Sequence, residues 1–435
     1  MVRSMRSSSI VLWMVGLGCA ALLAARPAAA QGMRIEDAVR LALGKNERAR
    51  QAELRVEAAE GGLYRARSQF LPTLTASGDL SRTILPSDQD DGWGLRGQLR
   101  LSQPIIDPTS WPSYAQARHN LTAEREGSTQ DMRVLGFDAA RAFLQALANE
   151  QVLVAARSRL DRAQANLDDA KARAEAGLAS TNDGTRAALD VASAARDVAQ
   201  QRGSVQRAYL ALGLIVGQTV NGPLAPPSGA ARIEALMARG SEALVRSAPD
   251  RRADVRALHA RADALRSSAD EPYYRLAPSL NATATATGTP DPSPQQSGYD
   301  VALGLGLTWQ IFDAGRYGDM KQRSAQAADA RLEEGLKRRT AITDVRAALV
   351  SFNTARATFR IAEDALAAAR QNSEETTVLY RQGLARSIEL SDANSRLFEA
   401  EVTVVSSRLS LEQACIELRY ALGLEPIEVA RGGGR

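Results

Sequence analysis

The stretch that decides the fold is residues 278–311, which reads PSLNATATATGTPDPSPQQSGYDVALGLGLTWQI. Apolar and polar residues alternate from Leu280 to Thr287, and from Tyr299 to Trp309 an apolar residue again stands at every second position. This period of two predicts two β-strands, each with one apolar face and one polar or small face. Strands of about ten residues with aromatic residues near their ends are typical of a membrane barrel with a water-filled lumen.

A second pair of strands is predicted 206 residues earlier, where Pro72 corresponds to Pro278. We therefore expect four strands, at about residues 72–85, 93–104, 278–289 and 298–311. Four strands cannot close a barrel, because known membrane barrels have roughly eight or more strands. An open sheet edge in lipid would also leave backbone groups unpaired at several kcal/mol each. We infer that several copies of the chain share one barrel.

The duplication extends to the helices, since Gly177-Leu-Ala matches Gly383-Leu-Ala at the same spacing. Each half is predicted as helix, strand, strand, helix, helix. The helices at about 112–176 and 315–382 contain no internal proline and would be about 100 Å long. Apolar residues recur every seven positions along them, which predicts a left-handed coiled coil.

The helices that flank the long ones are predicted to be about half as long. The leading helices are expected at about 35–69 and 243–268, and the return helices at about 183–216 and 388–422. Two short helices stacked end to end match one long helix, which suggests a cylinder wall of continuous and broken helices. The predicted organisation is a first repeat at 31–216, a mid-height segment at 217–239, a second repeat at 240–422 and a tail at 423–435.

The first thirty residues read as a secretory signal peptide. Arg3 and Arg6 precede an apolar run, and Ala28-Ala-Ala30 offers small residues for cleavage before Gln31. The run is too short for a membrane anchor, and the residues before Cys19 are a poor lipidation signal, although the sequence leaves lipidation open. Removal of residues 1–30 would lower the formal net charge from +4 to +1, so the basic excess does not indicate nucleic-acid binding.

Little in the sequence points to catalysis or to a cofactor. The mature chain would keep one cysteine, Cys415, and two isolated histidines, His119 and His259. These are too few for a His/Cys metal cluster, and no nucleophile elbow, P-loop or HExxH pattern occurs. We therefore expect no enzyme activity, no metal and no cofactor.

The sequence resembles the TolC-like outer-membrane efflux proteins over nearly all of the mature chain. The resemblance rests on Ile35–Leu43 followed by Asn46, on Phe70-Leu-Pro72 and on Trp309–Arg316, together with the duplication. It implies a mostly helical chain with a membrane β-barrel portion, in which a trimer shares one 12-stranded barrel and a periplasmic coiled-coil tunnel. It also implies an outer-membrane location, docking to a periplasmic adaptor, and an inner-membrane transporter that supplies the energy.

The same resemblance suggests a gate at the helical tips. The acidic constriction of the family falls six and nine positions after Gly383, at Glu389 and Asp392. These carboxylates share a helix face, and threefold symmetry would make a ring of six that favours cations. The alternative is an ordinary acidic first turn, which the helix dipole favours in any case.

Further tip residues are suggested in the same way. In the family, a tyrosine, an arginine and an acid link neighbouring helices and hold the tunnel shut. Tyr380 matches the tyrosine position, whereas Ala385 stands at the usual arginine position and Arg386 follows it. The complete predicted set is Asp183, Tyr380, Arg381 and Arg386 as a tip network, with Gly177 and Gly383 as helix caps and adaptor-docking turns.

Alternatives exist for both the residues and the protein. Tyr380 could simply end the heptad stripe, and each glycine could serve only as a cap. Two departures from the family pattern also stand out: Pro108–Pro112 replaces the usual glycine turn, and Gly184 replaces an aliphatic residue. A periplasmic adaptor or scaffold would explain the coiled coil but not four paired strands, so we favour an export channel. The exported substrate and the class of transporter are not encoded in any recognisable motif.

Overall fold

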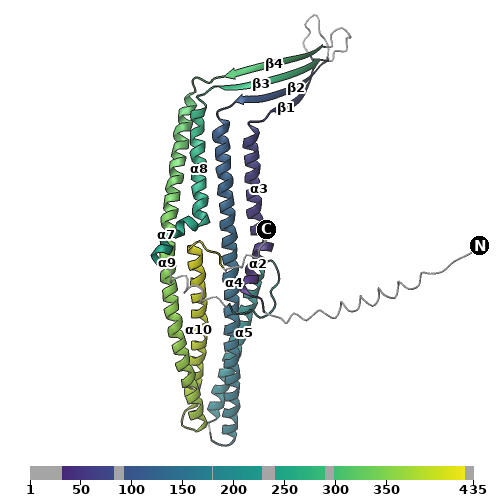
Figure 1. Ribbon diagram of the computed structural model, residues 1–435. Helices are drawn as coiled ribbons and strands as arrows, with labels where there is room; N and C mark the ends of the chain where they lie inside the picture. Colours follow the sequence, from purple (N-terminus) through teal and green to yellow (C-terminus); the bar gives the residue numbers. More distant parts are fainter. Residues whose placement is uncertain (1–31, 83–92, 179, 228–240, 290–297, 427–435) are drawn as a thin grey trace, which may run out of the picture.

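The computed structural model describes residues 32–82, 93–178, 180–227, 241–289 and 298–426. It is a long helical body with a four-stranded sheet at one end and two helical hairpin turns at the other (Figure 1). The expected signal peptide with Cys19, residues 228–239 of the mid-height segment and residues 427–435 of the tail lie outside the described residues.

The two repeats have the same order of elements. The first contains α2 (Ile35–Lys45), α3 (Glu47–Ser68), β1 (Thr73–Arg82), β2 (Trp93–Ile106), α4 (Ser110–Glu175) and α5 (Thr181–Val216). The second contains α7 (Ser241–Arg251), α8 (Ala253–Tyr274), β3 (Ser279–Thr289), β4 (Gly298–Thr308), α9 (Ala314–Arg381) and α10 (Ser387–Ala421). The predictions of a mostly helical chain, four strands and two tandem repeats are confirmed.

The sheet is antiparallel, in the order β1-β2-β3-β4. One face carries rows of apolar residues, such as Leu74, Leu101, Ala284 and Leu303, which are partners in register across all four strands. The opposite face carries the intervening polar or small residues. Leu303 is 82% exposed and Leu74 is 71% exposed, so no described part of the same chain covers the apolar face.

The long helices α4 and α9 contain 66 and 68 residues, which corresponds to about 100 Å each. Their seven-residue stripes are buried near mid-height, as shown by Ala139 and Ala146 on α4 and by Val345 and Phe352 on α9. The shorter α5 and α10 run back along α4 and α9 in the half of the body that ends in the tips, while α3 and α8 lie in the half next to the sheet (Figure 1).

Each leading helix is interrupted, which the sequence pattern does not predict. The interruptions lie at Asn46 and Arg252, and both residues have extended backbone. The side chain of Asn46 accepts a hydrogen bond from the Arg48 N–H (2.9 Å) and donates one to the Ile215 carbonyl (2.8 Å). The first bond stabilises a new helix start because it satisfies a backbone N–H that has no partner within the helix, and the second joins this start to the end of α5.

Arg252 stabilises the second interruption with charge. Its buried guanidinium donates hydrogen bonds to Asp254 and Asp344, both at 2.7 Å, and Asp254 also pairs with Lys337 at 3.0 Å. Burial alone would raise the pKa of Asp254, but the hydrogen bonds from Arg252 and Lys337 lower it to about 2. The interruption between α7 and α8 is thereby joined to α9.

The core lies at mid-height and is duplicated. In the first repeat it includes Val39 and Leu212, and in the second it includes Val245 and Leu418, which occupy the corresponding positions. Glu150 on α4 attaches the mid-height segment to this core, because its carboxylate accepts hydrogen bonds from the Leu224 N–H and the Tyr209 hydroxyl. None of the described helices is both long enough and apolar enough to cross a membrane.

Candidate functional site

The tips of the body are two helical turns with the same geometry. Gly177 and Gly383 have φ values of +71° and +77°, the left-handed conformation that favours glycine. In each turn the following leucine N–H bonds back to the helix: Leu178 to the Arg173 carbonyl at 2.8 Å, and Leu384 to the Leu379 carbonyl at 2.9 Å. This is the Schellman cap. Leu178 and Leu384 are 80% and 73% exposed, so both tips present an apolar side chain.

Arg173, in the last turn of α4, links the two tips. Its guanidinium donates hydrogen bonds to the carbonyls of Tyr380 (2.9 Å) and Arg381 (2.7 Å), and lies 4.7 Å from the centre of the Tyr380 ring. The last carbonyls of a helix lack partners within it and carry partial negative charge. Arg173 therefore caps α9 from the neighbouring hairpin and also makes a cation–π contact.

Tyr380 lies beneath this contact and is only 6% exposed. Burial raises the pKa of its hydroxyl, the Arg173 charge opposes that rise, and the carboxylates of Asp183 and Asp169 add to it. The structure thus brings Tyr380 and Asp183 into one electrostatic neighbourhood across the two hairpins.

Arg381 and Arg386 do not join this network through their side chains. Both are exposed, and neither guanidinium forms an ion pair within the described part of the single chain. Arg173, which is not among the residues predicted from the sequence, makes the link instead. The sequence gives only a weak signal for Arg173, because the helix dipole favours a cation in the last turn of many helices. The second repeat has Leu379 at the corresponding position, so the duplication does not point to an arginine there.

The two acidic residues lie at the start of α10. The carboxylate of Glu389 accepts a hydrogen bond from the Arg386 N–H at 3.1 Å, which caps the helix. Asp392 pairs with Arg396 at 2.8 Å, and the two side chains are 59% and 68% exposed. Exposed pairs of this kind contribute little to stability, but Arg396 places a positive charge beside one of the two candidate gate carboxylates.

A second link joins the hairpins further from the turns. The Ser391 hydroxyl on α10 donates a hydrogen bond to the Asp190 carboxylate on α5. A buried hydrogen bond of 2.9 Å between Ser373 and Asn394 joins α9 to α10. Within the described ranges, no group of histidine, cysteine, aspartate and glutamate side chains could hold a metal ion. The tips are therefore built from contacts between helices.

An amphipathic four-stranded sheet at the end of two long helical hairpins defines a class of protein: a membrane-embedded conduit with a long helical extension. The family of outer membrane efflux proteins matches residues 38–218 and 244–424, and the chain belongs to this family. The two matched segments start 206 residues apart, which is the spacing of the repeat. No curated protein matches the chain closely in sequence.

Several solved structures share the fold at low sequence identity. The open-state MtrE channel of Neisseria gonorrhoeae has a TM-score of 0.76 and 18% identity, with 90% of this chain and 89% of that one covered. VceC of Vibrio cholerae has a TM-score of 0.74 and 18% identity, with 90% and 97% covered. The CmeC channel of Campylobacter jejuni has a TM-score of 0.74 and 16% identity, with 91% and 87% covered.

The family and the fold together identify an outer-membrane efflux channel with a long helical periplasmic portion. The prediction of a channel is confirmed, and the alternative of a periplasmic adaptor or scaffold is not supported. The family is one of channels and not of enzymes.

Proposed function

We propose that three copies of this chain form one channel, which passively conducts substrates from a periplasmic adaptor and an inner-membrane transporter to the exterior. The observation that carries this proposal is the open sheet: β1 and β4 are both edge strands of the single chain. An open edge beside an exposed apolar face is unfavourable in lipid. Pairing β4 of one copy with β1 of the next removes every edge, and three copies supply twelve strands.

The helices support the same assembly. Within one chain, neighbouring helices follow the order α5-α4-α10-α9 near the tips and α3-α4-α8-α9 near the sheet. Exposed apolar residues occur on both outer helices of the half near the tips: Leu210 (75%) and Leu214 (79%) on α5, and Val350 (66%) and Ile361 (68%) on α9. Apolar surface on two opposite edges suits contact between copies of the chain.

In this assembly we assign the gate to the tips. Glu389 and Asp392 would line the mouth of the tunnel, because both are exposed at the start of α10. Asp183 and Tyr380 would form the tip network together with Arg173, which fixes one hairpin to the other, and the exposed side chains of Arg381 and Arg386 would join it only through contacts with a neighbouring copy. The turns at Gly177 and Gly383 would dock an adaptor, with Leu178 and Leu384 as apolar contacts.

Disulfide cross-linking of the two sheet edges tests the shared barrel. In one chain, β1 and β4 are separated by two strands, which places them about 14 Å apart, too far for a disulfide. Cysteines at Thr73, Thr75, Ser77 or Asp79, each combined with cysteine at Ala302, can therefore be bridged only between copies. We expect one combination to give a covalent species of three chains. If the protein is folded in membranes and no combination gives a cross-link, the proposal is contradicted.

A further inference from the structure

The polar face of the sheet carries four charged residues in the described strands: Asp79, Arg96, Arg100 and Asp300. Arg96 is the direct cross-strand partner of Asp79, which places an acidic residue opposite it in register, although the two side chains form no ion pair within the described residues. Arg100 has Thr75 and Thr285 as its partners on the two sides. Of the two arginines, Arg96 has an acidic cross-strand partner and Arg100 has none.

Among the described residues, Arg100 is isolated from acidic groups. Asp79 is displaced from it by four positions in register, about 13 Å along the strands. Asp300 lies two strands away and two positions further along. Within the described ranges, the exposed Arg100 guanidinium makes neither a hydrogen bond nor an ion pair. A separation of 13 Å exceeds the Debye length of about 8 Å at physiological salt, so Asp79 does not neutralise Arg100.

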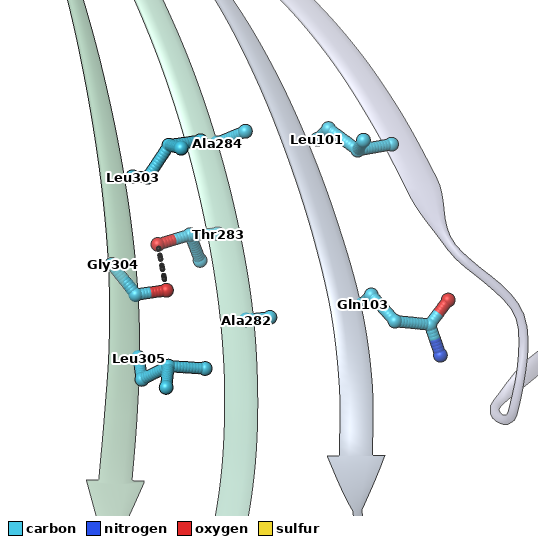
Figure 2. A pocket seen from close by; sticks show the side chains of 8 residues that line it. All are labelled: Leu101, Gln103, Ala282, Thr283, Ala284, Leu303, Gly304 and Leu305. Carbon is cyan, nitrogen blue, oxygen red and sulfur yellow. Dashed lines mark hydrogen bonds between the residues drawn. The ribbon is translucent and has the colours of Figure 1, made fainter.

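Hydroxyl groups surround this position on the same face. Thr75 and Thr285 flank Arg100 in its own row, and the adjacent row contains Thr73, Ser102 and Thr283. β4 contributes only Ala302 and Gly304 to these two rows, which leaves space above the sheet. Figure 2 shows this part of the sheet, with Leu101 and Leu303 on the neighbouring apolar positions and the Thr283 hydroxyl directed to the Gly304 carbonyl.

We propose that Arg100, repeated three times around the shared barrel, forms a binding ring for oxyanion groups of exported solutes, such as carboxylate, sulfate or phosphate. The inference rests on the proposed trimer, which turns the polar face inward. A guanidinium binds such groups through two parallel hydrogen bonds, and the flanking threonine hydroxyls can donate further ones. The ring would lie about 100 Å from the acidic tips, roughly the length of α4, so the two sites act independently.

Conductance of the full-length trimer in planar bilayers tests the ring, with sulfate and pyrophosphate as probes. Arg100→Gln should shift the reversal potential toward cation selectivity at an ionic strength of about 0.01 M, where the Debye length is about 30 Å, and should do so far less at about 1 M. Block by either oxyanion should weaken roughly two- to fivefold, the range of one exposed ion pair. Arg100→Lys should keep the selectivity but lose part of the block, because an ammonium group does not bind in the two-bond geometry.

The charge-neutral double variant Asp79→Asn/Arg96→Gln is the matched control and should leave both readouts unchanged. Unchanged selectivity and block in Arg100→Gln would overturn the proposal, and so would full oxyanion block in Arg100→Lys or an equal shift in the control. If the wild-type protein forms no discrete channels, the shared barrel fails. If it forms channels that Arg100→Gln does not alter, only the Arg100 site fails.

Discussion

Arg173 and Tyr380 join the two helical hairpins, because the Arg173 guanidinium caps the end of α9 and lies over the Tyr380 ring. Hydrogen bonds that involve a charged group contribute about 1.5–3 kcal/mol each when geometry is good. This contact is therefore strong enough to influence how far the tips can separate.

We expect Arg173→Ala to loosen the tips, so that single-channel conductance in planar bilayers rises while trimer formation is unchanged. Arg173→Lys should give an intermediate conductance, because it keeps the charge but cannot bridge two carbonyls. Lys171→Ala, on an exposed position of the same helix, is the control. Wild-type conductance in Arg173→Ala would show that the contact does not restrain the tips.

The charge of the proposed mouth can be changed in both directions. Glu389→Gln/Asp392→Asn should remove the preference for cations and the block by multivalent cations from the periplasmic side. Arg396→Gln should increase both, because it frees Asp392 from its partner. The control is Glu363→Gln/Asp364→Asn, which removes the same charge from exposed positions on α9. If the first variant keeps wild-type selectivity, Glu389 only caps α10 and Asp392 only pairs with Arg396.

The two faces of β4 should respond differently to a charge. Leu303→Arg should cost about 2–4 kcal/mol if the residue lies near the bilayer midplane. Ala302→Arg, one residue away on the polar face, should cost much less. Yield of heat-resistant trimer in membranes measures both. Equal loss from the two variants would mean that the faces are wrongly assigned.

Acid should weaken the interruption between α7 and α8. The pKa of Asp254 is lowered from 3.8 to about 2 in the folded protein, so its stabilising effect is full above pH 4 and is lost as the pH falls toward 2. This difference between the two pKa values corresponds to about 2 kcal/mol in the free energy of unfolding. The free energy of unfolding of Asp254→Asn should therefore fall less between pH 7 and pH 3 than that of the wild-type protein. Denaturant unfolding monitored by circular dichroism at the two pH values measures this. An identical pH dependence in both proteins would contradict this account.

The turn at Gly383 should be needed for coupling to an adaptor. Gly383→Val places a side chain at φ +77°, with a local cost of about 1–2 kcal/mol, and it obstructs the exposed turn. We expect normal trimers but reduced export with the native partners. Gly184→Ala is the control, because Gly184 lies inside α5 and an added Cβ meets no atom. Full export by Gly383→Val would exclude this turn as a docking surface.

Much of the fold follows from periodicity. The period of two in β3 and β4 and the seven-residue stripe through Val345 and Phe352 each report on one face of an element. The spacing of 206 residues reports the duplication of the chain. Such patterns are visible because burial selects side chains at regular intervals. The helix interruptions at Asn46 and Arg252 were missed, since they depend on Ile215 and Asp344, which are distant in sequence.

The tip contacts were less predictable for the same reason. Arg173 binds backbone carbonyls of another hairpin. Every residue has a backbone carbonyl, so the residue types at these positions do not reveal the partner. Arg396 was also missed, although its position four residues after Asp392 is a recognisable helix pairing. Residues whose role comes from contacts between the repeats can be recognised only in the structure.

Native mass spectrometry of the protein extracted in detergent tests the central claim most directly. A chain with two open sheet edges and an exposed apolar face should appear as an assembly of three chains that survives mild activation. A folded protein with the mass of one chain, still carrying its four strands, would contradict the shared barrel and with it the gate and the Arg100 ring.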